Sequence, residues 1–138
     1  MAPLYLLDTN VLSEPIRPRP NAGVMSRLQR HRAEVAVPSL VWHELWLGCL
    51  RLPLSRRRAD IEDYLNSVVA LMPMLPYGHD AAHWHACERA RLAALGQMPP
   101  FADGQIAAIA RVNDLTLITA NTSDYTAFDG LRILDWSR

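Results

Sequence analysis

The sequence predicts an α/β protein, a three-layer α/β/α sandwich with a central, mostly parallel sheet, as a single domain over residues 1–138. Short apolar runs alternate with longer helical patterns, which implies parallel strands joined by right-handed crossovers with helices on both faces. The chain shows no internal repeat and no interdomain linker. Its length is enough for one domain with its own core.

Each expected element follows from a local pattern of apolar residues. The expected strands span residues 4–7, 35–37, 72–75, 115–119 and 132–134. The expected helices span residues 21–32, 39–50, 56–71, 81–95 and 103–112. Ser39 is expected to cap the second helix, and Gly96 to follow the end of the fourth. Asp103 is expected to open the last helix.

Composition excludes several classes of protein. Cys49 and Cys87 lie far apart without a CxxC motif, so neither a disulfide framework nor a zinc knuckle is indicated. The N-terminal apolar run is short and carries Asp8, unlike a signal peptide. No run approaches the roughly 20 apolar residues of a membrane span. We therefore expect a reduced, cytoplasmic protein that does not enter the membrane.

All 14 basic residues are arginines, while the formal net charge is zero. The absence of lysine excludes a P-loop, Schiff-base catalysis and lysine-dependent phosphoaspartate sites. The arginines cluster at residues 17–32 and 51–58, and planar guanidinium groups suit phosphate. The alternative is that they are solvated helix faces. The candidates for contacts with phosphate are Arg17, Arg19, Arg56 and Arg57.

Glu44 stands out in the segment "SLVWHELWLGCL". Its neighbours three and four residues away are all apolar, so it projects from a helix face that should be buried. A buried carboxylate is costly unless a cation or hydrogen bonds compensate. A nearby arginine is one explanation, and a metal ion is the better one.

Other polar residues follow the expected strands. Asp8, after the first strand, would alone be read as a turn or cap residue. Asn121 and Asp124 follow the fourth strand and would alone be turn residues. Since ligands of open parallel sheets bind beyond the carboxyl ends of the strands, these positions together indicate a site. Asp8, Glu44 and Asp103 would repel one another there, and Mg²⁺ or Mn²⁺ would cancel that repulsion.

The order of several motifs resembles the PIN domain, specifically the VapC-type toxins of bacterial toxin–antitoxin pairs. The motifs are "LLDTNVLSE", "PSLVWHELWLG", "GQMPPFADGQIAAIA", "LTLITANTSDY" and "GLRILDW", and they span nearly the whole chain. The resemblance implies a metal-dependent ribonuclease with an α/β/α sandwich. It also implies a homodimer and a cognate antitoxin laid over the active-site groove.

The resemblance also assigns residues by position. Asp8, Glu44 and Asp103 match the three acidic residues of the family, and Asp124 matches an acidic residue that precedes an aromatic one. Asn121 stands where many members have aspartate, and this weakens a second metal position. Thr9, Asn10 and Thr119 are expected to orient the carboxylates or hold water molecules.

The expected reaction is Mg²⁺- or Mn²⁺-dependent hydrolysis of RNA phosphodiester bonds, as the toxin of a type II pair. Asp8 and Asp103 would hold the metal ion, Glu44 would complete the site, and rim arginines would hold the RNA backbone. The alternatives are a PIN-like DNA or flap nuclease, and an inactive PIN-fold module that only binds protein.

Two further features have simpler explanations. His79 and His83 have the i, i+4 spacing of zinc ligands, but no third ligand is indicated nearby, so structural or surface roles are favoured. The helix over residues 39–50 is apolar almost all round, with a second stripe formed by Trp42, Trp46, Cys49 and Leu50. Such a helix is either deeply buried or forms an interface.

Overall fold

The computed structural model describes residues 2–138, and its centre is a five-stranded, all-parallel sheet. The strand order is β3-β2-β1-β4-β5. The strands are β1 (Tyr5–Leu7), β2 (Val35–Pro38), β3 (Met74–Leu75), β4 (Thr116–Ile118) and β5 (Ile133–Leu134). All five lie within or overlap the expected strand segments, and the predicted fold class is confirmed.

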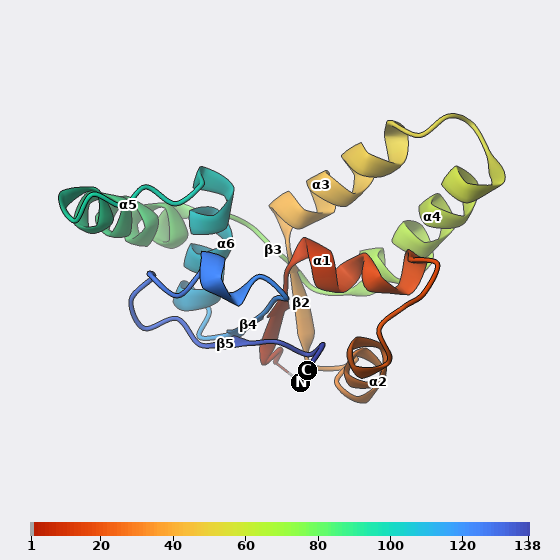
Figure 1. Ribbon diagram of the computed structural model, residues 1–138, viewed down its shortest axis with the longest axis horizontal. Coiled ribbons are helices and arrows are strands. Elements are labelled where there is room, and N and C mark those ends of the chain that lie inside the picture. The colour runs from red at the N-terminus through yellow and green to blue at the C-terminus, as the bar shows by residue number, and fades with distance from the viewer. Residues whose placement is uncertain (1) are drawn as a thin grey trace.

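Helices cover both sides of this sheet. They are α1 (Thr9–Leu12), α2 (Ala22–Arg30), α3 (Ser39–Leu50), α4 (Arg56–Ser67), α5 (His79–Ala94) and α6 (Phe101–Val112). Three short 3-10 turns, η1 (Glu14–Ile16), η2 (Val69–Leu71) and η3 (Thr122–Asp124), lie between them. In Figure 1, α5 and α6 lie on one side of the strands, and α2, α3 and α4 lie on the other. In residues 2–138 no helix is long and apolar enough to cross a membrane.

The register of the sheet brings the ends of β1 and β4 to the same level. Leu7 pairs with Ile118 in the parallel ladder, and both side chains are fully buried. The backbone N–H of Asp8 then donates to the carbonyl of Ile118 at 3.0 Å. Asp8 and Thr119 therefore leave the sheet side by side at its carboxyl edge.

The bounds expected for α3 are confirmed, but its expected cap and the expected start of α6 are wrong, and proline explains both differences. Pro38, in extended conformation, is the cap of α3, so Ser39 is the first helical residue and its side chain does not cap. Likewise α6 begins at Phe101 after Pro100, which places Asp103 inside the first turn. Proline favours extended backbone for the residue before it and suits helix starts. Ser and Asp are among the usual cap residues, so the sequence pattern favours Ser39 and Asp103 over these prolines.

The other differences concern helix ends. The expected helix over residues 56–71 ends at Ser67 and continues only as the 3-10 turn η2. The helix expected from residue 81 begins earlier, at His79. Gly96 follows it with a positive φ of 75°, as expected for a glycine just past a helix.

The segment after β4 is held down by an ion pair on α5. Glu88 is buried, accepts two hydrogen bonds from Arg91 and accepts the N–H of Asp129 at 2.8 Å. Arg91 also donates to the carbonyl of Ala127 at 2.9 Å. These hydrogen bonds lower the pKa of Glu88 despite its burial. The loop that carries η3 therefore has a fixed position against α5.

Candidate active site

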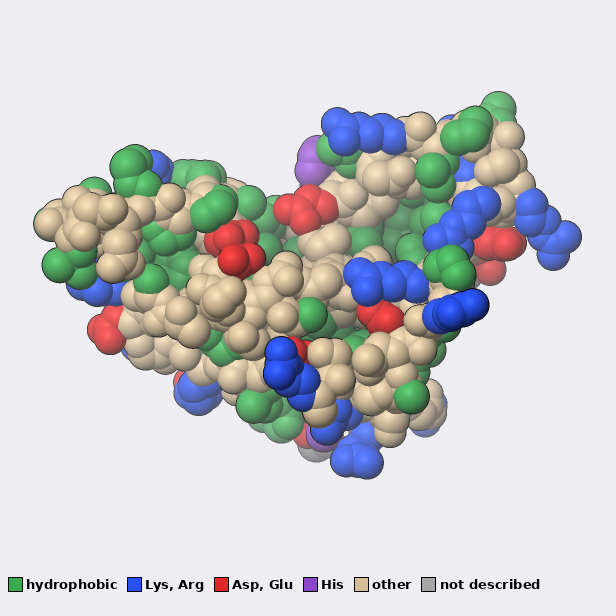
Figure 2. Space-filling view, in the orientation of Figure 1, with side chains coloured by type: hydrophobic (Ala, Val, Ile, Leu, Met, Phe, Trp, Pro, Cys, Tyr) green, Lys and Arg blue, Asp and Glu red, His purple; other side chains and the backbone are tan. Residues whose placement is uncertain are grey.

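A cleft opens at the carboxyl edge of the sheet, where α1, α3, α6 and η3 meet. Its volume is about 340 Å³. Figure 2 shows a hollow between the lobe of α3 and α4 and the lobe of α5 and α6, with acidic side chains on both sides of it. The lining residues are Asp8, Thr9, Asn10, Ser13, Arg17, Glu44, Asp103, Ile106, Asn121, Asp124 and Tyr125. All five residues predicted as catalytic are among them.

Asp8 is the most buried carboxylate of the cleft, with 6% of its surface exposed. It caps α1 by accepting the N–H of Thr9 at 2.8 Å. Its other oxygen, Oδ2, accepts the hydroxyl of Thr119 at 2.8 Å and that of Tyr125 at 3.2 Å. Asn10 donates to the same oxygen at 3.4 Å. Both carboxylate oxygens are therefore fixed in orientation by donors from β4, η3 and α1.

Glu44 is attached to this network through Thr9, whose hydroxyl donates to its Oε2 at 2.5 Å. Glu44 is only half-buried, and its neighbours Leu47 and Gly48 are exposed. The expectation that its helix face is buried is wrong: Val41, Leu45 and Cys49 form the buried face of α3. Glu44 instead stands at the wall of the cleft, where water or a cation can reach it.

Asp103 is half-buried in the first turn of α6, and its pKa reflects the other negative charges of the cleft. Burial, followed by the charges of Asp124, Asp8 and Glu44 in that order, raises its pKa from 3.8 to about 6. Like charges in one cleft disfavour the ionised form, and an opposite charge would restore it. The carboxylates therefore act on one another electrostatically, as expected for residues of a shared site.

The segment after β4 closes the cleft. Asn121 and Asp124 are both exposed, and Asn121 donates its backbone N–H to the hydroxyl of Thr119 at 3.1 Å. Tyr125 is buried, and its pKa is raised by burial and by the nearby negative charges, Asp8 first. Its hydroxyl thus remains a donor to Asp8. The sequence marks Tyr125 only as the aromatic residue after Asp124, because nothing in the pattern shows where its hydroxyl points.

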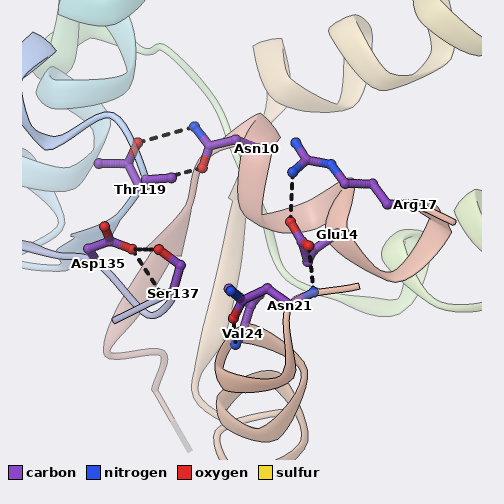
Figure 3. A network of polar contacts seen from close by, with 9 residues as sticks. Asn10, Glu14, Arg17, Asn21, Val24, Thr119, Asp135 and Ser137 are labelled. Carbon is purple, nitrogen blue, oxygen red and sulfur yellow. Dashed lines mark hydrogen bonds and ion pairs between the residues drawn. The ribbon is translucent and has the colours of Figure 1, made fainter. Parts of the chain in front are cut away.

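Three residues predicted to orient the carboxylates make contacts of that kind. Thr9 contacts Glu44 and Asp8, and Thr119 contacts Asp8. Asn10 donates to Thr119 at 3.3 Å and accepts the N–H of Ala120 at 3.0 Å, so it ties α1 to the end of β4. Figure 3 shows Asn10 and Thr119 facing one another across these two contacts.

Of the four candidate arginines, the structure places one in the cleft and three outside it. Arg17 lines the cleft. Arg19, Arg56 and Arg57 are exposed and do not line it, and Arg56 lies 3.9 Å from Asp60 on the outer face of α4. Ser13 and Ile106 also line the cleft and were not among the candidates. Helical periodicity could have found Ile106, which is three residues beyond Asp103, but it gives no signal for Ser13.

The donor set suits a hard divalent cation, although it is not a closed ligand cage. Among residues 2–138 no group of three or more His, Cys, Asp or Glu side chains lies close enough together to hold a metal ion. Mg²⁺ typically binds through one or two carboxylates and keeps several water molecules. Carboxylates spaced around a cleft that raise one another's proton affinity fit that mode of binding. His79 and His83 are exposed on α5 and form no such group.

Comparison with known protein families matches residues 5–130 to the PIN domain. The chain, with its parallel sheet and an acidic cleft at the carboxyl edge, therefore belongs to the PIN domain family. Among curated proteins, Toxin FitB of Neisseria gonorrhoeae is 34% identical over 130 residues, covering 91% of this chain and 94% of that protein. The tRNA(fMet)-specific endonuclease VapC of Shigella flexneri is 31% identical over 134 residues, covering 96% and 98%.

Comparison with solved structures gives the same kind of relative. The crystal structure of FitAcB from Neisseria gonorrhoeae has a TM-score of 0.89 at 31% identity and covers 96% of this chain and 98% of that chain. A member of the VapBC family of toxin-antitoxin systems, VapBC-5 from Mycobacterium tuberculosis, has a TM-score of 0.68 at 30% identity, with coverage of 97% and 96%. Within the PIN domain family, the chain is therefore of the VapC type.

Proposed function

We propose that this chain is an endoribonuclease that depends on Mg²⁺ or Mn²⁺ and acts as the toxin of a type II toxin–antitoxin pair. The observation that carries the proposal is the set of carboxylates in one cleft, where Asp103 has a pKa raised to about 6 by burial and by its acidic neighbours. The relative named as an endonuclease supports the reaction class, and the relative named as a toxin supports the role as a toxin.

Asp8 and Asp103 would hold the metal ion, with Glu44 as a further ligand or as acceptor for a metal-bound water. The ion would supply charge stabilisation at the phosphate and a lower pKa for the attacking water. Thr119 and Tyr125 hold the Oδ2 atom of Asp8, and Thr9 holds Glu44, so the two carboxylates need little reordering. Arg17, on the wall of the same cleft, would contact the RNA backbone.

A cognate antitoxin and a homodimer form part of the proposal. The support is the similarity to solved FitAcB and VapBC structures, together with the apolar residues that α3 leaves exposed. The single-domain organisation over residues 1–138 and a cytoplasmic location also remain proposals.

The decisive experiment measures cleavage of a fluorescent single-stranded RNA by the purified protein, with Mg²⁺, with Mn²⁺ and with EDTA. Cleavage is expected with either metal and not with EDTA. Asp8→Asn should abolish it, because the amide removes one of the charges that hold the cation. Asp60→Asn is the matched control, since Asp60 lies on the exposed face of α4, and it should cleave like the wild type.

A DNA oligonucleotide of the same sequence tests the alternatives. Faster cleavage of DNA than of RNA would support a DNA or flap nuclease instead. RNA cleavage that survives both EDTA and Asp8→Asn would refute the metal mechanism. No cleavage of either substrate, with an intact fold, would favour a module that only binds protein.

A further inference from the structure

A second cavity of about 400 Å³ adjoins the acidic cleft. The two share Asn10, Arg17 and Asn121 as common walls, so they lie side by side. The remaining walls of the second cavity come from η1, from the start of α2 and from the C-terminal segment. In Figure 3 the side chains of Asn10, Glu14, Asn21 and Asp135 surround this space. Its volume is within the range of cavities that bind small organic ligands, about 300–1,000 Å³.

Arg17 stands at the junction of the cleft and the cavity. Half of its side chain is exposed, and its Nη1 donates to Oε2 of Glu14 at 2.9 Å. A guanidinium group has five N–H donors. Across residues 2–138 this is its one hydrogen bond from the side chain, which leaves donors for a phosphate group beside the acidic cleft.

Glu14 fixes Arg17 in that position. It is buried, with 6% of its surface exposed, and its other oxygen accepts the backbone N–H of Asn21 at 2.6 Å. Figure 3 shows Glu14 between Arg17 and Asn21. One carboxylate therefore joins Arg17 to the start of α2, so the arginine does not have to be ordered when a ligand binds.

The opposite wall offers groups that suit a nucleoside rather than a bare anion. Asp135 accepts hydrogen bonds from the backbone N–H and the hydroxyl of Ser137. Burial acts to raise the pKa of Asp135, but the hydrogen bonds from Ser137 and Arg138 outweigh it and lower the pKa. A carboxylate and nearby amide groups can bind ribose hydroxyls and base amino groups. Asn121 is exposed at the boundary between the cavity and the cleft.

We propose that the second cavity binds a nucleotide of the RNA adjacent to the phosphate that is cut, with Arg17 contacting the phosphate that connects the two sites. Glu14 is a positioning residue that acts through Arg17. The inference rests on the ribonuclease function proposed above. It assigns a part of the substrate to the cavity, so contacts in the cavity can determine which RNA is selected.

A titration with 5′-AMP, followed through the backbone amide signals of the full chain in metal-free buffer, tests the site without requiring cleavage. Saturable shifts are expected at the amides of Asn21, Ala120 and Ser137, which line the cavity.

Arg17→Ala should raise the Kd for 5′-AMP about tenfold, because a charge-assisted hydrogen bond is lost. Arg17→Lys should retain part of the affinity, and Glu14→Gln should fall between the wild type and Arg17→Ala. Arg30→Ala, an exposed arginine on α2 outside the cavity, is the matched control and should bind 5′-AMP like the wild type.

RNA kinetics provide the second measurement. Arg17→Ala should raise KM for the RNA about tenfold, with a smaller fall in kcat, since Arg17 binds rather than reacts. If the wild type cleaves RNA but 5′-AMP shifts no amide of the cavity, or Arg17→Ala binds it unchanged, the inference is wrong and the proposed function stands. If 5′-AMP binds there and no RNA is cut with any metal, the nucleotide site stands and the proposed function fails. The amide spectra show directly whether each variant is folded.

Discussion

Thr9 joins two carboxylates of the cleft through different atoms. Its backbone N–H donates to Asp8, and its hydroxyl donates to Glu44, which comes from a separate helix. The two acidic residues are 36 positions apart in the chain, yet one residue donates a hydrogen bond to each of them. At this scale the site depends on hydroxyl donors as much as on its charges, because free carboxylates would rotate away from each other.

Replacing Thr9 by valine should therefore weaken metal binding without unfolding the protein. Valine has nearly the same shape, and the cap of α1 survives because it uses the backbone of residue 9. We expect Mn²⁺ affinity, measured by calorimetry, to fall by about 10–100-fold. Thr126→Val, which removes an exposed hydroxyl outside the cleft, is the control and should bind Mn²⁺ as the wild type does. Equal affinities of Thr9→Val and the wild type would contradict the role given to this hydroxyl.

Asp103 should make the stability of the metal-free protein depend on pH. Its folded-state pKa of about 6 is above the unfolded value of 3.8, so the native state binds this proton more tightly. The resulting stabilisation is present below about pH 4 and is lost as the pH rises through about 6. Asp103→Asn does not titrate, so it should have a higher Tm than the wild type at pH 7.5 and a similar Tm at pH 4.

Calorimetric scans in EDTA and in Mn²⁺ provide the measurement. Mn²⁺ should raise the Tm of the wild type at pH 7.5 more than that of Asp103→Asn, because the ion offsets the repulsion that the proton relieves at low pH. A Tm difference that stays the same from pH 4 to 7.5 would show that the ionised form of Asp103 does not destabilise the folded protein.

At the scale of elements, the packing of α5 against α6 determines where Asp103 lies. Gly104 follows Asp103 directly, and a Cβ atom at that position would lie 2.0 Å from Nε2 of His85 on α5. His85 is buried, and its Nδ1 is 2.8 Å from the hydroxyl of Tyr77. Burial, followed by the charge of Arg89, lowers the pKa of His85, which favours the neutral ring. Only glycine lets α6 approach this fixed ring so closely.

Gly104→Ala should consequently separate the two helices and displace Asp103. We expect a loss of about 1–3 kcal/mol in the free energy of unfolding, as for other overpacked cores, and a fall in RNA cleavage. Gly48→Ala on α3 is the matched control, since nothing lies within 4 Å of its Cβ position. That variant should gain roughly 0.5–1 kcal/mol from helix propensity. Urea denaturation measures both, and equal effects of the two substitutions would refute the packing argument.

The elements also show what the sequence could predict. The strands were predictable because short apolar runs are bounded by polar residues, and Asp8 directly follows one of them. The cap of α3 and the start of α6 were not, because Pro38 and Pro100 take the cap positions expected for Ser39 and Asp103. The environment of Glu44 was also misjudged, since apolar spacing does not reveal which face of α3 borders an open cleft. Contacts between distant segments, such as Tyr125 with Asp8, leave no local pattern.

At the scale of the whole molecule, α3 presents an apolar surface away from the sheet. Leu47 and Leu50 are 39% and 53% exposed, and they line a hollow of about 350 Å³ with Trp42, His43 and Trp46. The rings of Trp42 and Trp46 contact each other edge to face at 5.8 Å between centroids. Exposed apolar patches of this kind mark interfaces. This is the surface on which the expected homodimer would form.

Light scattering of the chain alone should accordingly give twice the mass of 15.5 kDa. Leu50→Glu should shift the protein to the monomer, because a charge would be buried in the interface. Leu54→Glu is the control: Leu54 is 88% exposed in the turn after α3 and does not line the hollow. A wild-type mass of one chain at micromolar concentration would count against a dimer through this surface.

The two ends of the chain are held beside each other. Tyr5 in β1 packs edge to face on Trp136 with 5.3 Å between ring centroids, and Arg27 donates to the carbonyl of Trp136. Figure 1 shows the segment before β1 and the segment after β5 close together below the central strands. A short linker could therefore join them, with new ends opened at the exposed turn around Leu54 between α3 and α4. Such a circular permutant would keep every strand pairing, and it would separate the order of the motifs along the chain from their arrangement in space.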